Sequence, residues 1–256
     1  MIKITIYNTK GGVGKTSLAV NLASAISRQG FRTLLIDNEP QADVTVWTSS
    51  FSHTEFLEDY YRKELFGEEY VVTPHVSDVF GIDIIPCTAH LVDIETLLSN
   101  KSSIRNSIMA RILEKVTDNY DYVIIDNMPT LSFLVINSFV ASDYIIIPTQ
   151  PSYLSASRIK DVVRYVNRIN DGPNPNLSVL GVSIQMVEKR TVFGRGMVNS
   201  IRKSYQDVNV FNTLIPFSVR VPESTFYHTS VYGHKQAGKI AASFDQLAKE
   251  VIGYAK

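Results

Sequence analysis

Composition and charge limit what this chain can be. Its 256 residues are 45% hydrophobic, and its 25 basic and 25 acidic side chains give a net charge of zero. That length and apolar content suffice for one large α/β core without disulfides or metal, so we expect a single domain spanning residues 1–256. Zero net charge excludes a chain that coats nucleic acid by bulk charge alone, and leaves room only for a local basic patch. The single cysteine, Cys87, excludes an internal disulfide and favours a reducing, cytoplasmic location.

The hydropathy pattern predicts no membrane segment. The apolar positions at the N-terminus alternate with polar ones, unlike those of a signal peptide. No apolar run approaches the roughly 18 residues that a membrane helix needs. We therefore expect a protein that does not enter a membrane.

The predicted elements begin with a strand and a helix that meet at a glycine-rich loop. Ile2, Ile4 and Ile6 alternate with polar residues and predict the strand, and apolar positions then recur at helical spacing as far as Gly30. Between them stands Asn8-Thr9-Lys10-Gly11-Gly12-Val13-Gly14-Lys15-Thr16. In such a loop the backbone N–H groups and the helix N-terminus bind phosphate oxygens, a lysine reaches the outer phosphates, and the next hydroxyl holds Mg²⁺. We therefore expect a nucleoside triphosphate to contact Gly11, Gly12, Val13, Gly14, Lys15, Thr16 and Ser17.

Two later strands are predicted to end in acidic residues near this loop. Residues 32–37 form an apolar run that ends in Asp37-Asn38-Glu39-Pro40-Gln41, and residues 122–126 form another that ends in Asp126. Ligands of open α/β sheets bind at the carboxyl ends of the strands, so these carboxylates should face the phosphates. We expect Asp126 to bind Mg²⁺ through water. The alternative for these acids is a solvated turn or a helix cap without a metal role.

Lys10 distinguishes this loop from the usual phosphate loop. The usual phosphate loop has glycine where Thr9 stands, and here a second lysine precedes the glycine pair. With this Lys-Gly-Gly-x-Gly-Lys-Thr loop the chain resembles the ParA/MinD family of deviant Walker A ATPases. Within it, the chain is most similar to the ParA (Soj-like) partition ATPases without an N-terminal helix-turn-helix. In that family the lysine matching Lys10 crosses to the partner subunit's nucleotide, which implies an ATP-dependent homodimer.

The resemblance also implies roles for the acids. Asp37 would help Thr16 and Asp126 to organise the Mg²⁺ shell, and the second acid of the same segment would position or activate the attacking water. That second acid is Glu39 here, whereas the family usually has aspartate. The extra methylene moves the carboxylate by roughly 1.5 Å, which implies slow hydrolysis or a rearranged loop. The implied catalytic residues are Lys10, Lys15, Asp37 and Glu39.

The last third of the chain carries the predicted base pocket and a basic cluster. The segments around Met186 and Pro216 resemble those with which the family contacts adenine. Basic residues then gather on a predicted loop and helix start, a pattern typical of contact with phosphate backbones and equally of a solvated charged face. By resemblance, the DNA-binding residues are Lys189, Arg190, Arg195, Arg202, Lys203 and Arg220. For Arg220 the alternative is a structural salt bridge.

Fold and function follow from the order of these motifs. We expect a P-loop NTPase fold, a doubly wound, mainly parallel sheet with helices on both faces. The resemblance implies an ATPase that uses ATP and Mg²⁺, dimerises on ATP and binds nonspecific double-stranded DNA. Its hydrolysis would be stimulated by a ParB-like adaptor, and it would position a plasmid, a chromosome or another cargo on the nucleoid in the cytoplasm.

Two alternative functions stay open. A MinD-like membrane-associated positioning ATPase would need a basic amphipathic tail, which residues 247–252 do not provide. A nucleotide-gated DNA-binding scaffold with little hydrolysis would suit the exchange of aspartate for Glu39. Two other users of this fold agree less well with the sequence. The nitrogenase iron protein needs paired cysteines, and a dethiobiotin synthetase would not explain Lys10 or the segment that follows Asp37.

Overall fold

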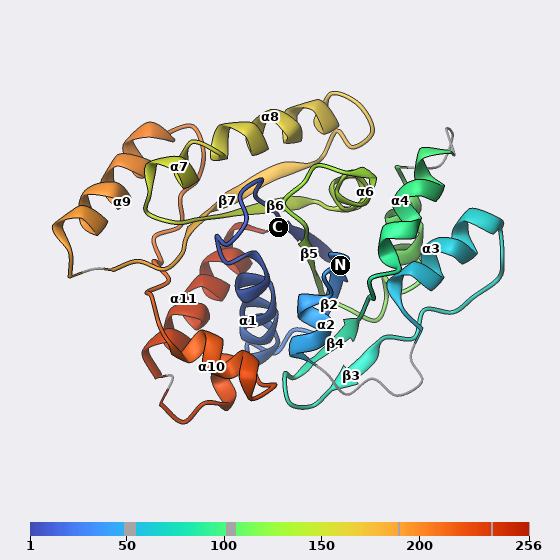
Figure 1. Ribbon diagram of the computed structural model, residues 1–256, viewed down its shortest axis with the longest axis horizontal. Coiled ribbons are helices and arrows are strands. Elements are labelled where there is room, and N and C mark those ends of the chain that lie inside the picture. Colours follow the sequence, from blue (N-terminus) through green and yellow to red (C-terminus); the bar gives the residue numbers. More distant parts are fainter. Residues whose placement is uncertain (49–54, 101–105, 189, 237, 256) are drawn as a thin grey trace.

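A seven-stranded sheet forms the centre of the fold (Figure 1). The computed structural model describes residues 1–48, 55–100, 106–188, 190–236 and 238–255. Across the sheet the strands run in the order β3-β4-β2-β5-β1-β6-β7, and all neighbours are parallel except β3 and β4. The mainly parallel sheet predicted from the sequence is therefore confirmed. The strands are β1 (Ile2–Ile6), β2 (Thr33–Asn38), β3 (His75–Ser77), β4 (Ile82–Ile85), β5 (Tyr122–Asn127), β6 (Tyr144–Thr149) and β7 (Ser178–Ile184).

Helices cover both faces of the sheet (Figure 1). One layer comprises α1 (Lys15–Arg28), α2 (Asp43–Trp47), α10 (Arg220–Phe226), the 3₁₀ helix η1 (Val231–Gly233) and α11 (Gly238–Tyr254). The other comprises α3 (Leu57–Phe66), α4 (Leu91–Ser99), α5 (Ile108–Glu114), α6 (Phe133–Ala141), α7 (Tyr153–Ala156), α8 (Ile159–Asn170) and α9 (Val192–Ser204). Within the described residues, no helix combines the length and the apolar character that crossing a membrane requires.

The strands are apolar throughout because both of their faces are covered. In β5, Ile124 packs against α1 and α11 on one face, whereas Val123 and Ile125 pack against α3 to α6 on the other. All six residues of β5 are buried. A strand buried on both sides loses the alternation of apolar and polar residues and appears as a continuous apolar run. Each such apolar side chain stabilises the fold by about 1.5–3 kcal/mol relative to exposure.

The sheet brings the glycine loop, Asp37 and Asp126 together at one edge. β1 lies between β5 and β6, and β5 lies between β1 and β2. In the register of these parallel strands, Ile6 is paired with Asp126, and Asp126 is paired with Asp37. Both acids therefore stand at the carboxyl edge, level with the end of the strand that leads into the glycine loop. This edge is where open parallel sheets bind their ligands.

Candidate functional site

The glycine loop is a tight turn at the middle of this edge, and its backbone geometry suits an anion. Gly12 and Gly14 have φ values of 72° and 88°, a left-handed conformation that strains any residue with a Cβ atom. No side chain caps the first turn of α1, which begins at Lys15. The N–H groups of that turn and the positive end of the helix dipole can therefore meet a phosphate. Lys15 is only 7% exposed, although its ammonium group carries a charge, as expected of a lysine placed for a bound anion.

Asp126 is a buried acid without a partner. It is fully buried, and neither carboxylate oxygen forms a hydrogen bond with the described residues. The Thr16 hydroxyl lies nearby and lowers the pKa of Asp126. Burial and then the charge of Asp37 outweigh this effect and raise the pKa of Asp126 to about 8. Such a carboxyl is costly to bury, and Mg²⁺ with its water ligands is a group that would satisfy it.

Asp37, in contrast, accepts hydrogen bonds, mainly from Thr45 and also from the backbone N of Glu39 at 3.4 Å. Its Oδ2 accepts two hydrogen bonds from Thr45 in α2, one from the backbone N at 2.8 Å and one from the hydroxyl at 2.7 Å. Burial raises the pKa of Asp37 to about 6, and the bonds from Thr45 limit that rise. The support of Asp37 by Thr45 was not predictable from the sequence, because only the fold brings α2 against the end of β2. Magnesium sites use one or two carboxylates together with substrate phosphates, which agrees with these residues.

Glu39 lies beyond the end of β2 and is half-buried. Burial raises its pKa, while the charge of Lys15 lowers it, so the glutamate lies within electrostatic reach of the loop lysine. The Glu39 carbonyl accepts hydrogen bonds from the backbone N of Ala42 at 2.8 Å and from Cys87 Sγ at 3.1 Å. Burial also raises the pKa of the Cys87 thiol, which keeps it a hydrogen donor. These hydrogen bonds fix the backbone of Glu39, the acid predicted to position the attacking water.

Lys10 contacts its own chain in this structure. Its Nζ donates a hydrogen bond to the hydroxyl of Ser155 in α7 at 2.8 Å, and its backbone N donates to Asn8 Oδ1 at 3.0 Å. Ser155 is fully buried. The side chain is thus directed to the segment that follows β6. The crossing of Lys10 to a partner subunit stays a prediction.

A cavity of about 340 Å³ lies beside the glycine loop, next to Gly14 and Ser17. Met186 and Pro216, the two residues predicted to contact adenine, both line it. They come together because Val187 and Pro216 form a parallel β-bridge beyond the end of β7. The remaining lining residues are mostly apolar and include Ile215, Phe217, Val221, Pro222 and Phe244. A mainly apolar cavity with a few polar groups suits a planar base.

Gln150, which was not among the predicted site residues, connects this cavity to the loop. The residue follows β6, and its Nε2 donates a hydrogen bond to the Gly12 carbonyl at 2.8 Å. The same nitrogen lies 3.1 Å from Met186 Sδ. Both contacts depend on the pairing of β6 with β1 and β7, so nothing in the local sequence could mark this glutamine.

Three of the predicted DNA-binding residues are exposed around α9. Arg190, Arg195 and Lys203 are exposed to solvent, and Arg195 Nη1 also donates to the Arg190 carbonyl at 3.3 Å. Lys189 lies outside the described residues. Helices α7, α8 and α9 lie along the same side of the molecule in Figure 1. Helix α8 also exposes basic residues, namely Lys160, Arg164 and Arg168, of which Arg164 is paired with Asp161 at 2.7 Å.

The other two predicted DNA-binding residues are engaged within the chain. Arg202 Nη2 donates to two backbone carbonyls, those of residues 211 and 212, at 3.3 and 3.2 Å. Arg220 forms an ion pair with Glu223 at 2.5 Å and a hydrogen bond with Gln236 at 2.6 Å. The salt bridge considered as the alternative for Arg220 is thus present. Contact of these two arginines with DNA stays a prediction, and it would require them to leave these partners.

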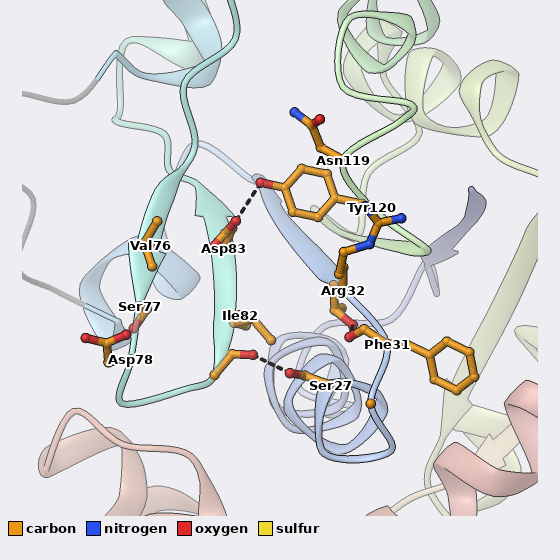
Figure 2. Close-up of a pocket in the computed structure, with 13 residues that line it drawn as sticks. Ser27, Phe31, Arg32, Val76, Ser77, Asp78, Ile82, Asp83, Asn119 and Tyr120 are labelled. Atoms are coloured by element: carbon orange, nitrogen blue, oxygen red, sulfur yellow. Dashed lines mark hydrogen bonds between the residues drawn. The ribbon is translucent and has the colours of Figure 1, made fainter.

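A second cavity, of about 480 Å³, lies at the opposite end of the sheet, where β2 and β4 begin. Figure 2 shows its lining, with the Tyr120 hydroxyl pointing at Asp83, to which it donates a hydrogen bond at 2.7 Å. Ser27 donates to the Gly81 carbonyl, and Arg32 is bound to Asp121 at 2.8 Å. Because these polar groups bind one another, they are already engaged and offer little to a ligand.

Comparison with known proteins agrees with this geometry. A family profile described as an AAA domain matches residues 1–179. The sporulation initiation inhibitor protein Soj of Bacillus subtilis is 32% identical over 248 residues, which cover 97% of each chain. The chromosome partitioning protein ParA of Caulobacter vibrioides is 33% identical over 254 residues, which cover 97% of this chain and 93% of that protein.

Solved structures share the fold at lower identity. The Cyanothece McdA complex with ATP superposes with a TM-score of 0.83 at 19% identity, covering 99% of this chain and 96% of that one. Cobyrinic acid a,c-diamide synthase from Mycobacterium smegmatis, with bound ADP and magnesium, gives 0.78 at 23% identity and covers 97% and 93%. The structural likeness supports the P-loop ATPase fold, and the sequence relatives define the group within it. This chain belongs to the ParA/Soj family of partition and positioning ATPases.

Proposed function

We propose that this chain is a Mg²⁺-dependent ATPase that dimerises on ATP, binds nonspecific double-stranded DNA in that state and positions a cargo. A ParB-like adaptor would stimulate hydrolysis and so end the DNA-bound state. The observation that carries the proposal is the convergence of the glycine loop, Asp126 and Asp37 at three adjacent strand ends. The kinship with ParA and Soj supports the partition role.

Different residues of the site would bind different parts of the nucleotide. The N–H groups of residues 11–17 and the ammonium of Lys15 would bind the phosphates, and the cavity lined by Met186 would take the base. Thr16 and Asp126 would hold Mg²⁺, which supplies charge neutralisation at the phosphates. Asp37, fixed by Thr45, would orient water around the ion. These groups would then surround the triphosphate with aligned donors and charges, which lowers the cost of reorganisation.

Hydrolysis requires a water molecule aligned with the terminal phosphate. Glu39 is the acid proposed to align it and to accept its proton, and burial raises the pKa of Glu39 in the direction that suits proton acceptance. Lys10 is proposed to act in the partner subunit's site. There it would exchange the neutral hydroxyl of Ser155 for a phosphate oxygen, and a charge-assisted hydrogen bond is roughly twice as strong as a neutral one.

The charge distribution supports the DNA-binding part of the proposal. Residues 150–256 carry 14 lysines and arginines against 7 aspartates and glutamates, although the whole chain is neutral. Arg190, Arg195 and Lys203 are exposed within this region. A surface of this kind binds phosphate backbones without reading bases, and its affinity falls as salt rises. Two such surfaces in one dimer bind far more strongly than one.

The experiment that tests the proposal is fluorescence anisotropy of a random-sequence duplex with ATP, ADP or no nucleotide. We expect binding only with ATP, lost in Lys10→Ala and Lys15→Ala, and weakened in an Arg190→Ala/Arg195→Ala variant. Arg62→Ala, which changes an exposed arginine of α3 far from the basic surface, is the matched control and should bind as the wild type does. Equal binding in all nucleotide states, or none in any state, would overturn the switch.

The same samples separate the alternative functions. The nucleotide-gated scaffold is favoured by one observation, the glutamate at position 39, and it predicts ATP-dependent DNA binding with no turnover even when adaptor and DNA are present. The MinD-like alternative predicts ATP-dependent sedimentation with anionic lipid vesicles and no DNA binding. The proposed function predicts DNA binding, measurable turnover and no sedimentation with vesicles.

A further inference from the structure

We infer that Gln150 is a positioning residue that holds the phosphate loop in its anion-binding form and ties it to the base cavity. The inference rests on the nucleotide-binding part of the proposed function and not on DNA binding. It concerns one side-chain amide with two contacts, to the Gly12 carbonyl at 2.8 Å and to Met186 Sδ at 3.1 Å. Neither contact follows from the motifs that identify the loop.

The peptide between Gly12 and Val13 needs to be held in one orientation. An added Cβ atom at Gly11 or Gly12 would meet nothing within 4 Å, so this part of the loop has open space around its backbone. Gly12 already has a φ of 72°, and glycine accepts positive and negative φ about equally well. Rotation of this peptide would exchange the directions of its carbonyl and its N–H by changing ψ of Gly12 together with φ of Val13, so the buried, β-branched Val13 side chain also resists it.

The hydrogen bond from Gln150 favours one of those two orientations. A trans peptide is planar, and its C=O and N–H point in opposite directions. The hydrogen bond from Gln150 fixes the Gly12 carbonyl toward the end of β6, so the N–H of Val13 points away from it. A flipped peptide would present a carbonyl oxygen to the phosphates in place of an N–H donor. The glutamine therefore favours the loop form that attracts an anion.

The second contact links the loop to the base cavity. Met186 has a φ of 55°, a left-handed conformation that is uncommon for a residue with a side chain and costs about 1 kcal/mol. Its neighbours are fixed, because Gln185 N donates to the Thr149 carbonyl at 2.7 Å and Val187 N donates to the Ile215 carbonyl at 2.9 Å. The Met186 side chain also reaches the loop directly, since its Cε lies 3.4 Å from the position of a Cβ atom at Gly14. The Met186 side chain therefore lines the base cavity and also contacts both Gln150 and the loop, so it connects the cavity to the loop.

The test compares two probes, ADP and inorganic triphosphate, each with Mg²⁺, by calorimetry on the full chain. Gln150→Met keeps the length of the side chain but cannot donate a hydrogen bond. Because loss of one neutral hydrogen bond changes an equilibrium by about three- to tenfold, we expect Gln150→Met to weaken both probes by that factor. Met186→Leu keeps the apolar volume and removes the sulfur, and we expect it to weaken ADP alone. Gln29→Met, at an exposed glutamine of the helix end, is the matched control.

A structural role and a positioning role give different results. Positioning acts on bound phosphate in the ground state and the transition state alike, so Gln150→Met should raise KM for ATP by about the same factor as the dissociation constants, with kcat unchanged. Its thermal unfolding without ligand should match that of the wild type. In the double variant the effects on ADP should be less than additive, because both substitutions break the same link.

The inference is overturned by three outcomes. Wild-type affinity of Gln150→Met for both probes would show that the loop holds its form without the glutamine. Weakening for ADP alone would mean that Gln150 shapes only the base cavity. Failure of the wild-type chain to bind either probe would overturn this inference together with the nucleotide-binding part of the proposed function. Loss of ATP-dependent DNA binding alone would count against the proposed function and leave the inference standing.

Discussion

Replacing Asp126 with asparagine should stabilise the metal-free protein while abolishing Mg²⁺-dependent hydrolysis. Both effects have the same cause. The carboxyl of Asp126 is fully buried, has no hydrogen-bond partner among the described residues, and lies next to Asp37 in register. Its charge is useful only when a cation binds. Asparagine has nearly the same shape and no charge to bury.

The magnitude follows from the pKa. Burial and the neighbouring charge raise the pKa of Asp126 from 3.8 to about 8, a change of about four units, and each unit corresponds to about 1.36 kcal/mol. The folded protein holds this proton more tightly than the unfolded chain does. The unfolding free energy of the metal-free protein therefore falls as pH rises from about 4 to about 8, by up to about 5 kcal/mol. The Asp126→Asn substitution removes this slope, so the variant should exceed the wild type by about 2–5 kcal/mol at pH 8 and by little at pH 4.

Urea unfolding in EDTA at pH 5, 6, 7 and 8 measures this difference. Asp207→Asn, a change at an exposed aspartate, is the matched control and should follow the wild type at every pH. Addition of Mg²⁺ and ADP should stabilise the wild type and narrow its deficit, because the bound ion supplies the charge that the carboxylate lacks. An Asp126→Asn variant that is less stable than the wild type at pH 8 without metal would refute the reasoning.

Three further predictions test other parts of the structure. Thr45→Val removes the hydroxyl bond, one of the three hydrogen bonds that the Asp37 carboxylate accepts, and should raise the Mg²⁺ concentration needed for half-maximal turnover by about tenfold, whereas Thr45→Ser should retain the wild-type value. Glu39→Gln should bind ATP normally but turn it over about 10²-fold more slowly in single-turnover assays, and unchanged turnover would exclude the proposed role. Gly181→Ala should lower the unfolding free energy by about 1–3 kcal/mol in urea, because its Cβ would lie 2.8 Å from the Phe211 ring.

The sequence was sufficient for the parts of the site that are contiguous in the chain. The glycine loop, the acids at the ends of β2 and β5, and the mainly parallel sheet were all predicted correctly, because each depends on local pattern and on a general property of open α/β sheets. The gathering of Met186 and Pro216 around one cavity agrees with the role implied by resemblance.

The residues that support these groups were not predictable in the same way. Thr45 binds Asp37 only because α2 turns back against β2, and Gln150 reaches Gly12 across 138 positions of sequence. Likewise, the charge of Arg220 suggested contact with DNA, but its ion pair with Glu223 depends on one helical turn and its bond to Gln236 on the fold. A side chain's type indicates which partners suit it, and only the fold decides which partners it meets.

The net charge of the chain likewise does not show where the charged residues lie in the fold. The chain is neutral overall, yet residues 50–121 carry 13 acidic and 6 basic side chains, whereas residues 150–210 carry 4 and 9. The first segment supplies α3, α4 and α5, which pack toward β4, and the second supplies α8 and α9, which pack toward β7. Figure 1 shows α3 and α9 on opposite sides of the molecule. β4 and β7 are five strand spacings apart, roughly 24 Å, whereas salt screens charges over about 8 Å. The two regions therefore do not cancel, and a chain that is neutral overall carries a local excess of basic side chains in the segment that supplies α8 and α9.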